Sequence, residues 1–203
     1  MAKLIVYYAH PGQRHSHANR EMSRVAREIA SITFVDLYAE YPRSDIDIDR
    51  EQQRLLDHEV ILFQFPLFWY STPSLIKEWQ DLVLEHGFAY GSGGDRLKGK
   101  RMMLAISAAG PQDAYAKSGY QRFPLRTFLT PLEQTAILCE MEFTPPYVLY
   151  ASLRAPGDGR VTPHAEAYRT LLEAVRDDRF DFAAAAAQDV PTFETLPVRQ
   201  KAL

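Results

Sequence analysis

Three segments of this sequence carry residues that could hold a planar ligand with a phosphate group. In the first segment, His10 follows an apolar run, and Ser16, His17, Ala18 and Asn19 lie where a helix is predicted to open. Hydroxyl, imidazole and amide donors beside a helix N-terminus favour an anion, because the free N–H groups there carry partial positive charge. A serine or asparagine before a helix is also an ordinary cap, so this segment by itself leaves both interpretations open.

The second segment contains three consecutive large aromatic residues, Phe68, Trp69 and Tyr70, in a predicted loop. A loop has only one side to bury, so packing alone explains such a run poorly, and a wall that stacks on a planar ring is the better interpretation. The alternative is a hydrophobic staple or a subunit contact. We predict that this loop contacts the ligand through Pro66, Leu67, Phe68, Trp69 and Tyr70.

The third segment is small and follows another apolar run; it consists of Ser107, Ala108, Ala109 and Gly110. Small side chains let backbone N–H groups approach the edge of a planar ring closely. Together the three segments would form a phosphate pocket, a stacking wall and a hydrogen-bonding rim. No metal site is expected, because the six histidines show no pairing at ligand spacing and the single cysteine excludes a cysteine cluster.

Length and composition predict one globular domain. With 203 residues, 46% of them hydrophobic, the chain can bury one sizeable core. A net charge of −3 argues against a nucleic-acid binder, which normally presents a basic face. No apolar run approaches the length of a membrane span and the first residues read as a strand, so a cytoplasmic location is expected. We place the domain in residues 1–178 and expect an extended or mobile tail over residues 179–203.

Behind these loops the chain alternates apolar runs with helical patterns, which is typical of a parallel sheet with crossover helices. For five parallel strands with right-handed crossovers, the order 2-1-3-4-5 is common, and ligands bind where strands 1 and 3 diverge. The predicted fold class is therefore α/β, a three-layer sandwich around a five-stranded parallel sheet. The five strands are expected at residues 4–8, 32–35, 60–63, 102–106 and 147–150.

Capping residues predict where the helices begin. Ser16 is expected to cap the first helix, and Asp49, which has a glutamine three residues later, a short second one. Thr72 and Thr162 each precede a proline, and proline is favoured at the first helical position. Pro131 is expected to break or kink the helical turns around it.

Three stretches of the sequence match a known family: YAHP at residues 8–11, QFPLFWYSTPSLIKEW at 64–79 and HGFAYG at 86–91. In these motifs the chain resembles the flavodoxin-like NAD(P)H:quinone oxidoreductases. Within that family it is most similar to the ancillary proteins of glutathione-gated potassium efflux systems, the Kef type. The resemblance extends over residues 4–172 and implies a flavodoxin-like fold.

The resemblance also implies a homodimer with a flavin at each active site, and so short a chain suits FMN better than FAD. By position, His10 and residues 16–19 would hold the phosphate and the ribityl chain, residues 67–70 would lie along the isoalloxazine ring, and residues 107–110 would meet its pyrimidine edge. Tyr115 would help to stabilise the reduced flavin. NAD(P)H would reduce the flavin and a quinone would reoxidise it in the same slot, which is a ping-pong mechanism of hydride transfer.

Two residues depart from the pattern of that family. Ala109 stands where the family usually has a glycine, so it is expected either to crowd the flavin or to be tolerated wherever the backbone φ is negative. Gln121 stands where the mammalian quinone reductases carry a histidine. The resemblance alone therefore does not imply a proton relay of that kind, through Tyr115 and the histidine, and the glutamine amide can still form a hydrogen bond.

The resemblance leaves a second class of function open. A Kef-type ancillary protein would bind the cytosolic face of a potassium efflux antiporter and regulate it, with weak or no catalysis, which would place the chain peripherally at the inner membrane. A flavodoxin-like electron carrier is a third class. It is less favoured, because a carrier that partners redox proteins is usually strongly acidic and this chain is nearly balanced in charge.

Overall fold

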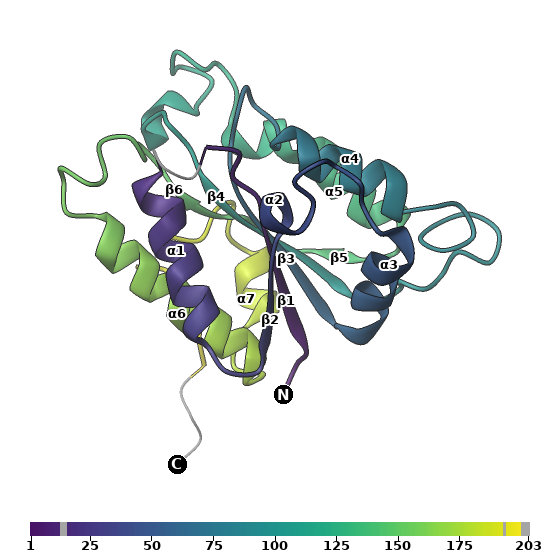
Figure 1. The fold of residues 1–203 in the computed structure, drawn as a ribbon. Coiled ribbons are helices and arrows are strands. Elements are labelled where there is room, and N and C mark those ends of the chain that lie inside the picture. The colour runs from purple at the N-terminus through teal and green to yellow at the C-terminus, as the bar shows by residue number, and fades with distance from the viewer. Residues whose placement is uncertain (13–15, 193, 200–203) are drawn as a thin grey trace.

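The computed structural model describes residues 1–12, 16–192 and 194–199. Its centre is a parallel sheet in the order β2-β1-β3-β4-β5, and β6 also pairs with β4 (Figure 1). The predicted α/β fold and strand order are confirmed. The strands are β1 (Leu4–Tyr8), β2 (Ile32–Asp36), β3 (Val60–Pro66), β4 (Arg101–Ser107), β5 (Glu142–Phe143) and β6 (Tyr147–Leu149).

Helices cover both faces of the sheet, so β1 and β3 are buried along their whole length and read as continuous apolar runs. One helical layer packs in the hydrophobic core on one face and consists of α1 (His17–Glu28), α6 (Val161–Arg176) and α7 (Phe182–Ala186). The other layer packs on the opposite face and consists of α2 (Leu37–Glu40), α3 (Ile48–Asp57), α4 (Ser74–Val83) and α5 (Thr130–Leu138).

The sheet has six strands rather than the predicted five. The last position is shared by β5, which pairs with the start of β4, and β6, which pairs with its end. Pro145 and Pro146 separate the two short strands. Neither proline has an N–H group, so neither can donate to a sheet ladder. The prediction of one strand at residues 147–150 therefore recovered only β6 and missed β5.

Helix boundaries bear out one predicted cap and correct three others. Ser16 caps α1 through its side chain, as expected. Asp47 rather than Asp49 caps α3, because its Oδ1 accepts the Arg50 N–H. Pro73 itself is the N-cap residue of α4. Arg160 rather than Thr162 is the N-cap residue of α6, which begins at Val161.

Pro131 opens a helix rather than breaking one. It lies in the first turn of α5, after a 3₁₀ helix that covers Leu125–Leu129. A proline in the first turn loses no intrahelical hydrogen bond, since the N–H groups there have no intrahelical acceptor. Within the described residues, every helix is too short or too polar to cross a bilayer.

Described parts of the predicted tail pack on the body of the protein. Phe180 and Ala185 are buried in the core that α1 and α6 share. Phe180 also forms an antiparallel bridge with Val198. Residue 193 and residues 200–203 lie outside the described part, so the division of the chain after residue 178 stays a prediction.

A buried carboxylate joins α3 to the surrounding layer. The Glu51 side chain is fully buried and accepts hydrogen bonds from Tyr41 Oη at 2.6 Å and Trp79 Nε1 at 3.0 Å. Arg54 donates to the same carboxylate at 2.5 Å. Because these three donors all bond to the Glu51 carboxylate, the buried carboxylate has hydrogen-bond partners without water.

Candidate functional site

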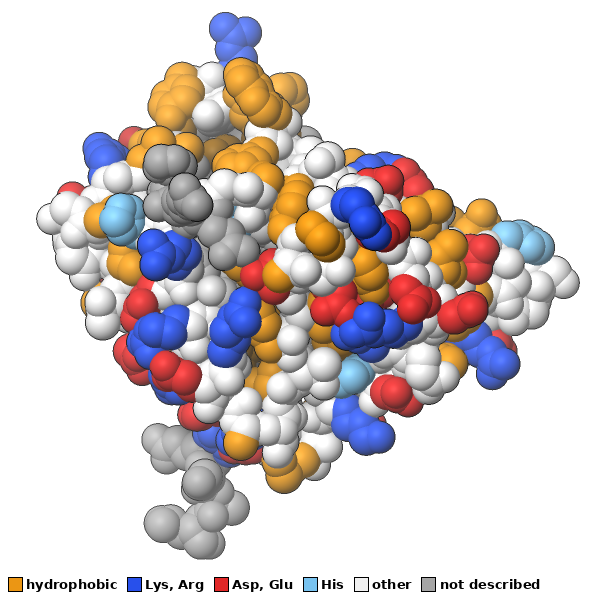
Figure 2. Space-filling view, viewed as in Figure 1, with side chains coloured by type: hydrophobic (Ala, Val, Ile, Leu, Met, Phe, Trp, Pro, Cys, Tyr) orange, Lys and Arg blue, Asp and Glu red, His pale blue; other side chains and the backbone are white. Residues whose placement is uncertain are grey.

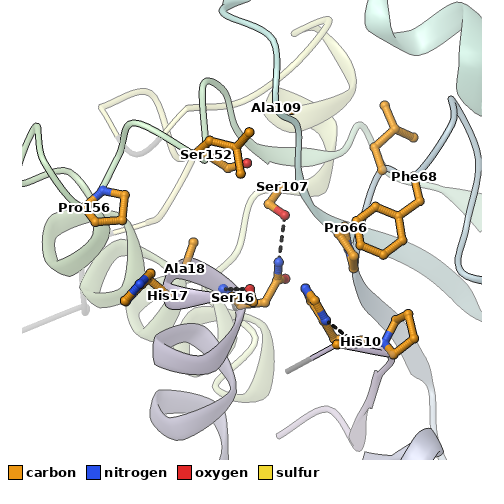
Figure 3. Close-up of a pocket in the computed structure, with 15 residues that line it drawn as sticks. His10, Ser16, His17, Ala18, Pro66, Phe68, Ser107, Ala109, Ser152 and Pro156 are labelled. Atoms are coloured by element: carbon orange, nitrogen blue, oxygen red, sulfur yellow. Dashed lines mark hydrogen bonds between the residues drawn. The ribbon is translucent and has the colours of Figure 1, made fainter. Parts of the chain in front are cut away.

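Two neighbouring cavities lie at the carboxyl edge of the sheet, where the three predicted segments meet. The first has a volume of about 560 Å³, and Figure 3 shows Ser16, His17 and Ala18 on one side of it and Pro66 and Phe68 on another. This edge follows strands β1, β3 and β4, as expected for a parallel sheet. The cavity is lined by His10, Pro11, Gly12, Ser16, His17, Ala18, Asn19, Pro66, Leu67, Phe68, Ser107, Ala109, Ser152, Leu153 and Pro156.

The N-terminus of α1 forms the polar end of the first cavity. Ser16 Oγ accepts the Asn19 N–H at 3.2 Å, which sets where the helix begins. The N–H groups of a first helical turn have no intrahelical acceptor, and they favour an anion beside Ser16 and His17. Residues 13–15 of the predicted polar loop lie outside the described residues.

A buried amide network lies directly beneath this cavity. Asn19 Nδ2 donates to Ser107 Oγ at 2.7 Å, and Gln64 Nε2 donates to the Asn19 backbone oxygen at 3.0 Å. Asn19 Oδ1 and Gln64 Oε1 are both buried and have no hydrogen-bond partner among the described residues. A buried acceptor without a partner is costly, and Asn19, which lines the cavity, could receive the missing hydrogen bond from a ligand hydroxyl group.

Gln64 was missed by sequence reasoning. It lies within β3, and its side chain is completely buried. The available signal was a single polar residue inside the apolar run VILFQFP, because a buried amide needs partners that neighbouring strands do not supply.

His10 presents one ring nitrogen to the chain and leaves the other for a ligand. The Gly12 N–H donates to His10 Nδ1 at 3.1 Å, so the proton of the neutral ring lies on Nε2. Burial lowers the pKa of His10, which favours this neutral form. The ring also meets Phe68 edge-on, at a centroid distance of 5.6 Å. His10 can therefore act as a hydrogen-bond donor at the cavity wall.

The aromatic loop is a tight, strained turn. Phe68 and Ser71 exchange two backbone hydrogen bonds of 3.0 Å each, and the two residues between them have positive φ, 47° at Trp69 and 66° at Tyr70. This is the geometry of a type I′ turn, which normally requires Asn or Gly. A left-handed backbone costs an L-residue about 1–2 kcal/mol. The turn leaves the Trp69 side chain 92% exposed.

The second cavity, of about 250 Å³, adjoins the first and shares two of its wall residues, Leu67 and Ala109. Burial raises the pKa of Tyr115, against the lowering effect of the Gly110 backbone, so its phenol keeps its proton at neutral pH. Ala109 has no left-handed φ, so the residue is accommodated without backbone strain. The cavity is lined by Leu67, Trp69, Tyr70, Ala109, Gly110, Tyr115, Tyr120 and Gln121.

Gly110 allows the cavity rim to close around it. A Cβ atom added there would lie 3.0 Å from Tyr115 Cε2 and 3.0 Å from Tyr120 Oη. Aromatic rings continue outward from this point, since Tyr115 contacts Phe128 at a centroid distance of 6.2 Å and Tyr70 contacts Phe128 at 4.8 Å. Figure 2 shows hydrophobic side chains gathered at the upper end of the molecule, which is the carboxyl edge of the sheet.

The structure brings nearly all of the predicted site residues to these two cavities. Ala108 is the exception, because it is fully buried and lines neither of them. Its N–H donates to Leu149 O at 2.9 Å, so this amide faces β6 rather than a ligand. Trp69, Tyr70, Gly110 and Tyr115 line only the second cavity.

The loop after β6 supplies a wall that sequence reasoning missed. Ser152, Leu153 and Pro156 line the first cavity, and no motif in the sequence marks them. Arg160 holds this loop in place by donating to Tyr150 O at 2.9 Å and to Ala151 O at 3.1 Å. Only the crossover that brings β6 beside β4 places these residues at the site.

The donor set fits a flavin mononucleotide. An α-helix N-terminus suits a phosphate, the unpartnered oxygen of Asn19 suits a ribityl hydroxyl group, and the aromatic and small-residue walls suit a planar ring. Among residues 1–12, 16–192 and 194–199, no group of three or more His, Cys, Asp or Glu side chains could hold a metal ion.

Comparison with known proteins gives consistent matches. The model of the family described as "Flavodoxin-like fold" matches residues 2–172. The chain is 44% identical over 170 residues to the glutathione-regulated potassium-efflux system ancillary protein KefG of Serratia proteamaculans, covering 84% of this chain and 92% of that protein.

Solved structures share the fold across most of their length. General stress protein 14 of Treponema denticola, solved in complex with FMN, is 34% identical, with a TM-score of 0.78 over 85% of this chain and 98% of that one. A protein from Streptomycin violaceusniger, described as a thermophilic tryptophan halogenase, is 38% identical. Its TM-score is 0.79, and the match covers 82% of this chain and 96% of that one.

An NADPH-quinone reductase from P. pentosaceus is 24% identical, with a TM-score of 0.73 over 83% of this chain and 96% of that one, and shares the fold. The fold family is set by the match over residues 2–172 and by the relative at 44% identity. This chain belongs to the flavodoxin-like fold family and is a homologue of the KefG ancillary proteins.

Proposed function

We propose that this protein is an FMN-dependent NAD(P)H:quinone oxidoreductase. The observation that carries the proposal is the pairing of an unpartnered buried acceptor at the cavity wall, Asn19 Oδ1, with the N-terminus of α1 in the same cavity. FMN is favoured over FAD by this fit and by the FMN complex of the Treponema denticola relative.

The residues of the site divide into three roles. Ser16, His17 and Ala18 hold the phosphate, and Asn19 holds a ribityl hydroxyl group. Gln64 supports Asn19 from beneath by donating to its backbone oxygen. Phe68 and Trp69 lie along the ring, and Ser107 with Ala109 meets its polar edge. The flavin supplies hydride transfer, from a nicotinamide to the ring and from the ring to a quinone.

The second cavity supports an alternating mechanism. With a volume of about 250 Å³, it offers room for one planar group beside Leu67 and Ala109. NAD(P)H and the quinone therefore occupy it in turn, as a ping-pong scheme requires. Tyr115 is a neutral phenol beside this cavity and donates a hydrogen bond where negative charge develops.

A homodimer is part of the proposal. Trp69 is 92% exposed, Tyr120 is 70% exposed and Phe123 is 53% exposed, all close to the second cavity. Exposed aromatic residues that rim a site are typical of an interaction surface. A second copy would complete the site there.

A second candidate function is regulatory. The relatives at 41–44% identity are named as ancillary proteins of a potassium efflux system. In that role the chain would remain in the cytoplasm and associate with the inner membrane through the antiporter, with weak or no catalysis.

One set of measurements tests both candidates. The purified protein is expected to show the visible spectrum of bound flavin and to reduce a benzoquinone with NAD(P)H, giving parallel double-reciprocal plots. Light scattering is expected to show twice the 23.2 kDa chain mass. Turnover no faster than that of free FMN would instead favour the regulatory role.

A further inference from the structure

Tyr120 carries a hydroxyl group that no described residue engages, at the rim of the second cavity. The residue lines that cavity with Tyr115 and Gln121 and is 70% exposed. Its hydroxyl lies close over Gly110, because a Cβ atom added there would be 3.0 Å from Tyr120 Oη. Among the described residues it has no hydrogen-bond partner.

The backbone fixes Tyr120 in this position. The Gln121 N–H donates to Ala114 O at 3.2 Å, and the Arg122 N–H donates to Gly119 O at 2.9 Å, which closes a turn that contains the tyrosine. A Cβ on Gly119 would lie only 2.3 Å from Ala114 O, so the segment requires glycine at that point. The phenol is therefore held over the cavity by a closed loop.

The cavity around this hydroxyl has a definite chemical character. Its walls include Leu67 and Trp69, and three tyrosines, Tyr70, Tyr115 and Tyr120, bring phenol groups to it. Tyr115 and Tyr120 meet at Gly110, and the rings of Tyr70 and Tyr115 both pack on Phe128. Flat apolar walls with hydroxyl donors fit a planar aromatic ligand that carries carbonyl acceptors.

We propose that Tyr120 donates its hydroxyl proton in a hydrogen bond to a carbonyl oxygen of a planar ligand in the second cavity. It thereby selects quinones and aromatic ketones over hydrocarbons of the same shape. The assignment of quinone as the physiological ligand rests on the proposed function, but the hydrogen bond can be tested separately.

Binding of two matched probes tests the hydrogen bond directly. In the flavin-loaded protein, the emission of Trp69 reports on ligands in the second cavity, since Trp69 lines it and Trp79 is buried. Tyr120→Phe is expected to weaken binding of 2-methyl-1,4-naphthoquinone about 3- to 10-fold, the range of a neutral hydrogen bond. Binding of 2-methylnaphthalene should not change. An equal loss for both probes, or no loss for the quinone, overturns the proposal.

Kinetics give a second readout. A carbonyl oxygen gains negative charge as a quinone is reduced, so Tyr120→Phe should lower kcat/KM for the quinone about 10- to 100-fold. Reduction of ferricyanide, which has no carbonyl group, should not change. Tyr38→Phe removes a hydroxyl from α2, outside both cavities, and serves as the matched control.

The two proposals fail in different ways. If the wild type reduces quinones and Tyr120→Phe matches it, Tyr120 is not the donor and the oxidoreductase function stands. If the wild type does not reduce quinones but Tyr120→Phe still loses naphthoquinone affinity selectively, the hydrogen bond stands and the enzymatic function is wrong.

Discussion

The side-chain amide of Asn19 donates to the hydroxyl of Ser107 across 2.7 Å, although the two residues are 88 positions apart in the sequence. This bond joins the first turn of α1 to the end of β4. It also turns Asn19 Oδ1 into a buried acceptor without a partner among the described residues. The geometry that fixes the site is thus also what leaves it in need of a ligand.

Replacing Ser16 and Asn19 together by alanine should weaken FMN binding by about 2 to 4 kcal/mol, because a charge-assisted hydrogen bond to the phosphate and a neutral one to the ribityl chain are lost. Fluorescence titration of the flavin measures the change. Ser23→Ala in the same helix is the control, since Ser23 Oγ bonds to Arg20 O and the residue lies outside both cavities. Flavin retained undiminished through gel filtration in the double variant would contradict the assignment.

Trp69→Asn should raise the free energy of unfolding by about 1 kcal/mol, because asparagine tolerates the left-handed backbone of the turn. Little packing is lost from a side chain that is 92% exposed. Urea unfolding measures the gain, and ligand titration should show weaker binding in the second cavity. Leu153→Asn, at an exposed position without positive φ, should bring no such gain.

His164 should make the protein sensitive to acid. Burial lowers the pKa of this histidine to about 3 from its ordinary 6.5, so the unfolded chain binds the proton first. The contribution to stability is complete above pH 6.5 and declines by up to about 5 kcal/mol as the pH falls to about 3. His164→Phe, which keeps the stacking on Tyr147 at 4.3 Å, should flatten the curve of unfolding free energy against pH in this range.

The control for this pH experiment is His86→Phe, which changes a histidine that lies exposed beyond the end of α4. Below pH 6.5, the unfolding free energy of His86→Phe should fall with pH as it does in the wild type. A His164→Phe curve parallel to the wild type would show that the buried imidazole does not set the acid stability.

Glu51→Ala should destabilise the fold by about 3–5 kcal/mol, because the buried donors of Tyr41 and Trp79 lose their acceptor. Urea unfolding followed by the emission of Trp79 measures the loss. Glu51→Gln keeps the shape and one acceptor and should lose less. The exposed Glu78→Ala on α4 should leave stability nearly unchanged, and an equal effect of the two alanine variants would refute the role of the network.

Phe180→Ala should cost about 3–5 kcal/mol of stability without changing FMN affinity, since Phe180 is buried in the core under α6 and lies outside both cavities. Thermal unfolding and flavin titration measure the two effects. Phe123→Ala, at an aromatic residue that is 53% exposed, is the control for stability. An unchanged Tm in Phe180→Ala would mean that the tail is a separate, loosely attached segment.

The fold was predictable because its signals are local. β1 was placed without error, and Ser16 marked the start of α1, because buried strands and side-chain caps depend on adjacent residues. β5 was missed because it has only two residues, too few to show the alternating or continuous apolar pattern by which a strand is recognised.

The site was predictable only where it lies next to strand ends. The segments after β1, β3 and β4 could be assigned to one sheet edge from topology alone. The loop after β6 could not, since Ser152 and Leu153 reach the cavity only because β6 pairs with β4, a contact that no motif in the sequence indicates. Ala108 was wrongly predicted to lie at the hydrogen-bonding rim. Its backbone N–H donates to Leu149 of β6, a contact that also depends on the pairing of distant segments.

The interruption between β5 and β6 has a consequence for behaviour at high concentration. An uninterrupted edge strand offers a row of free N–H and C=O groups on which another molecule can add a strand and start an aggregate. Here that edge is cut into runs of two and three residues by Pro145 and Pro146, which have no N–H to offer. Strand addition at this edge should therefore be disfavoured, and concentrated solutions should resist amyloid-type growth from it.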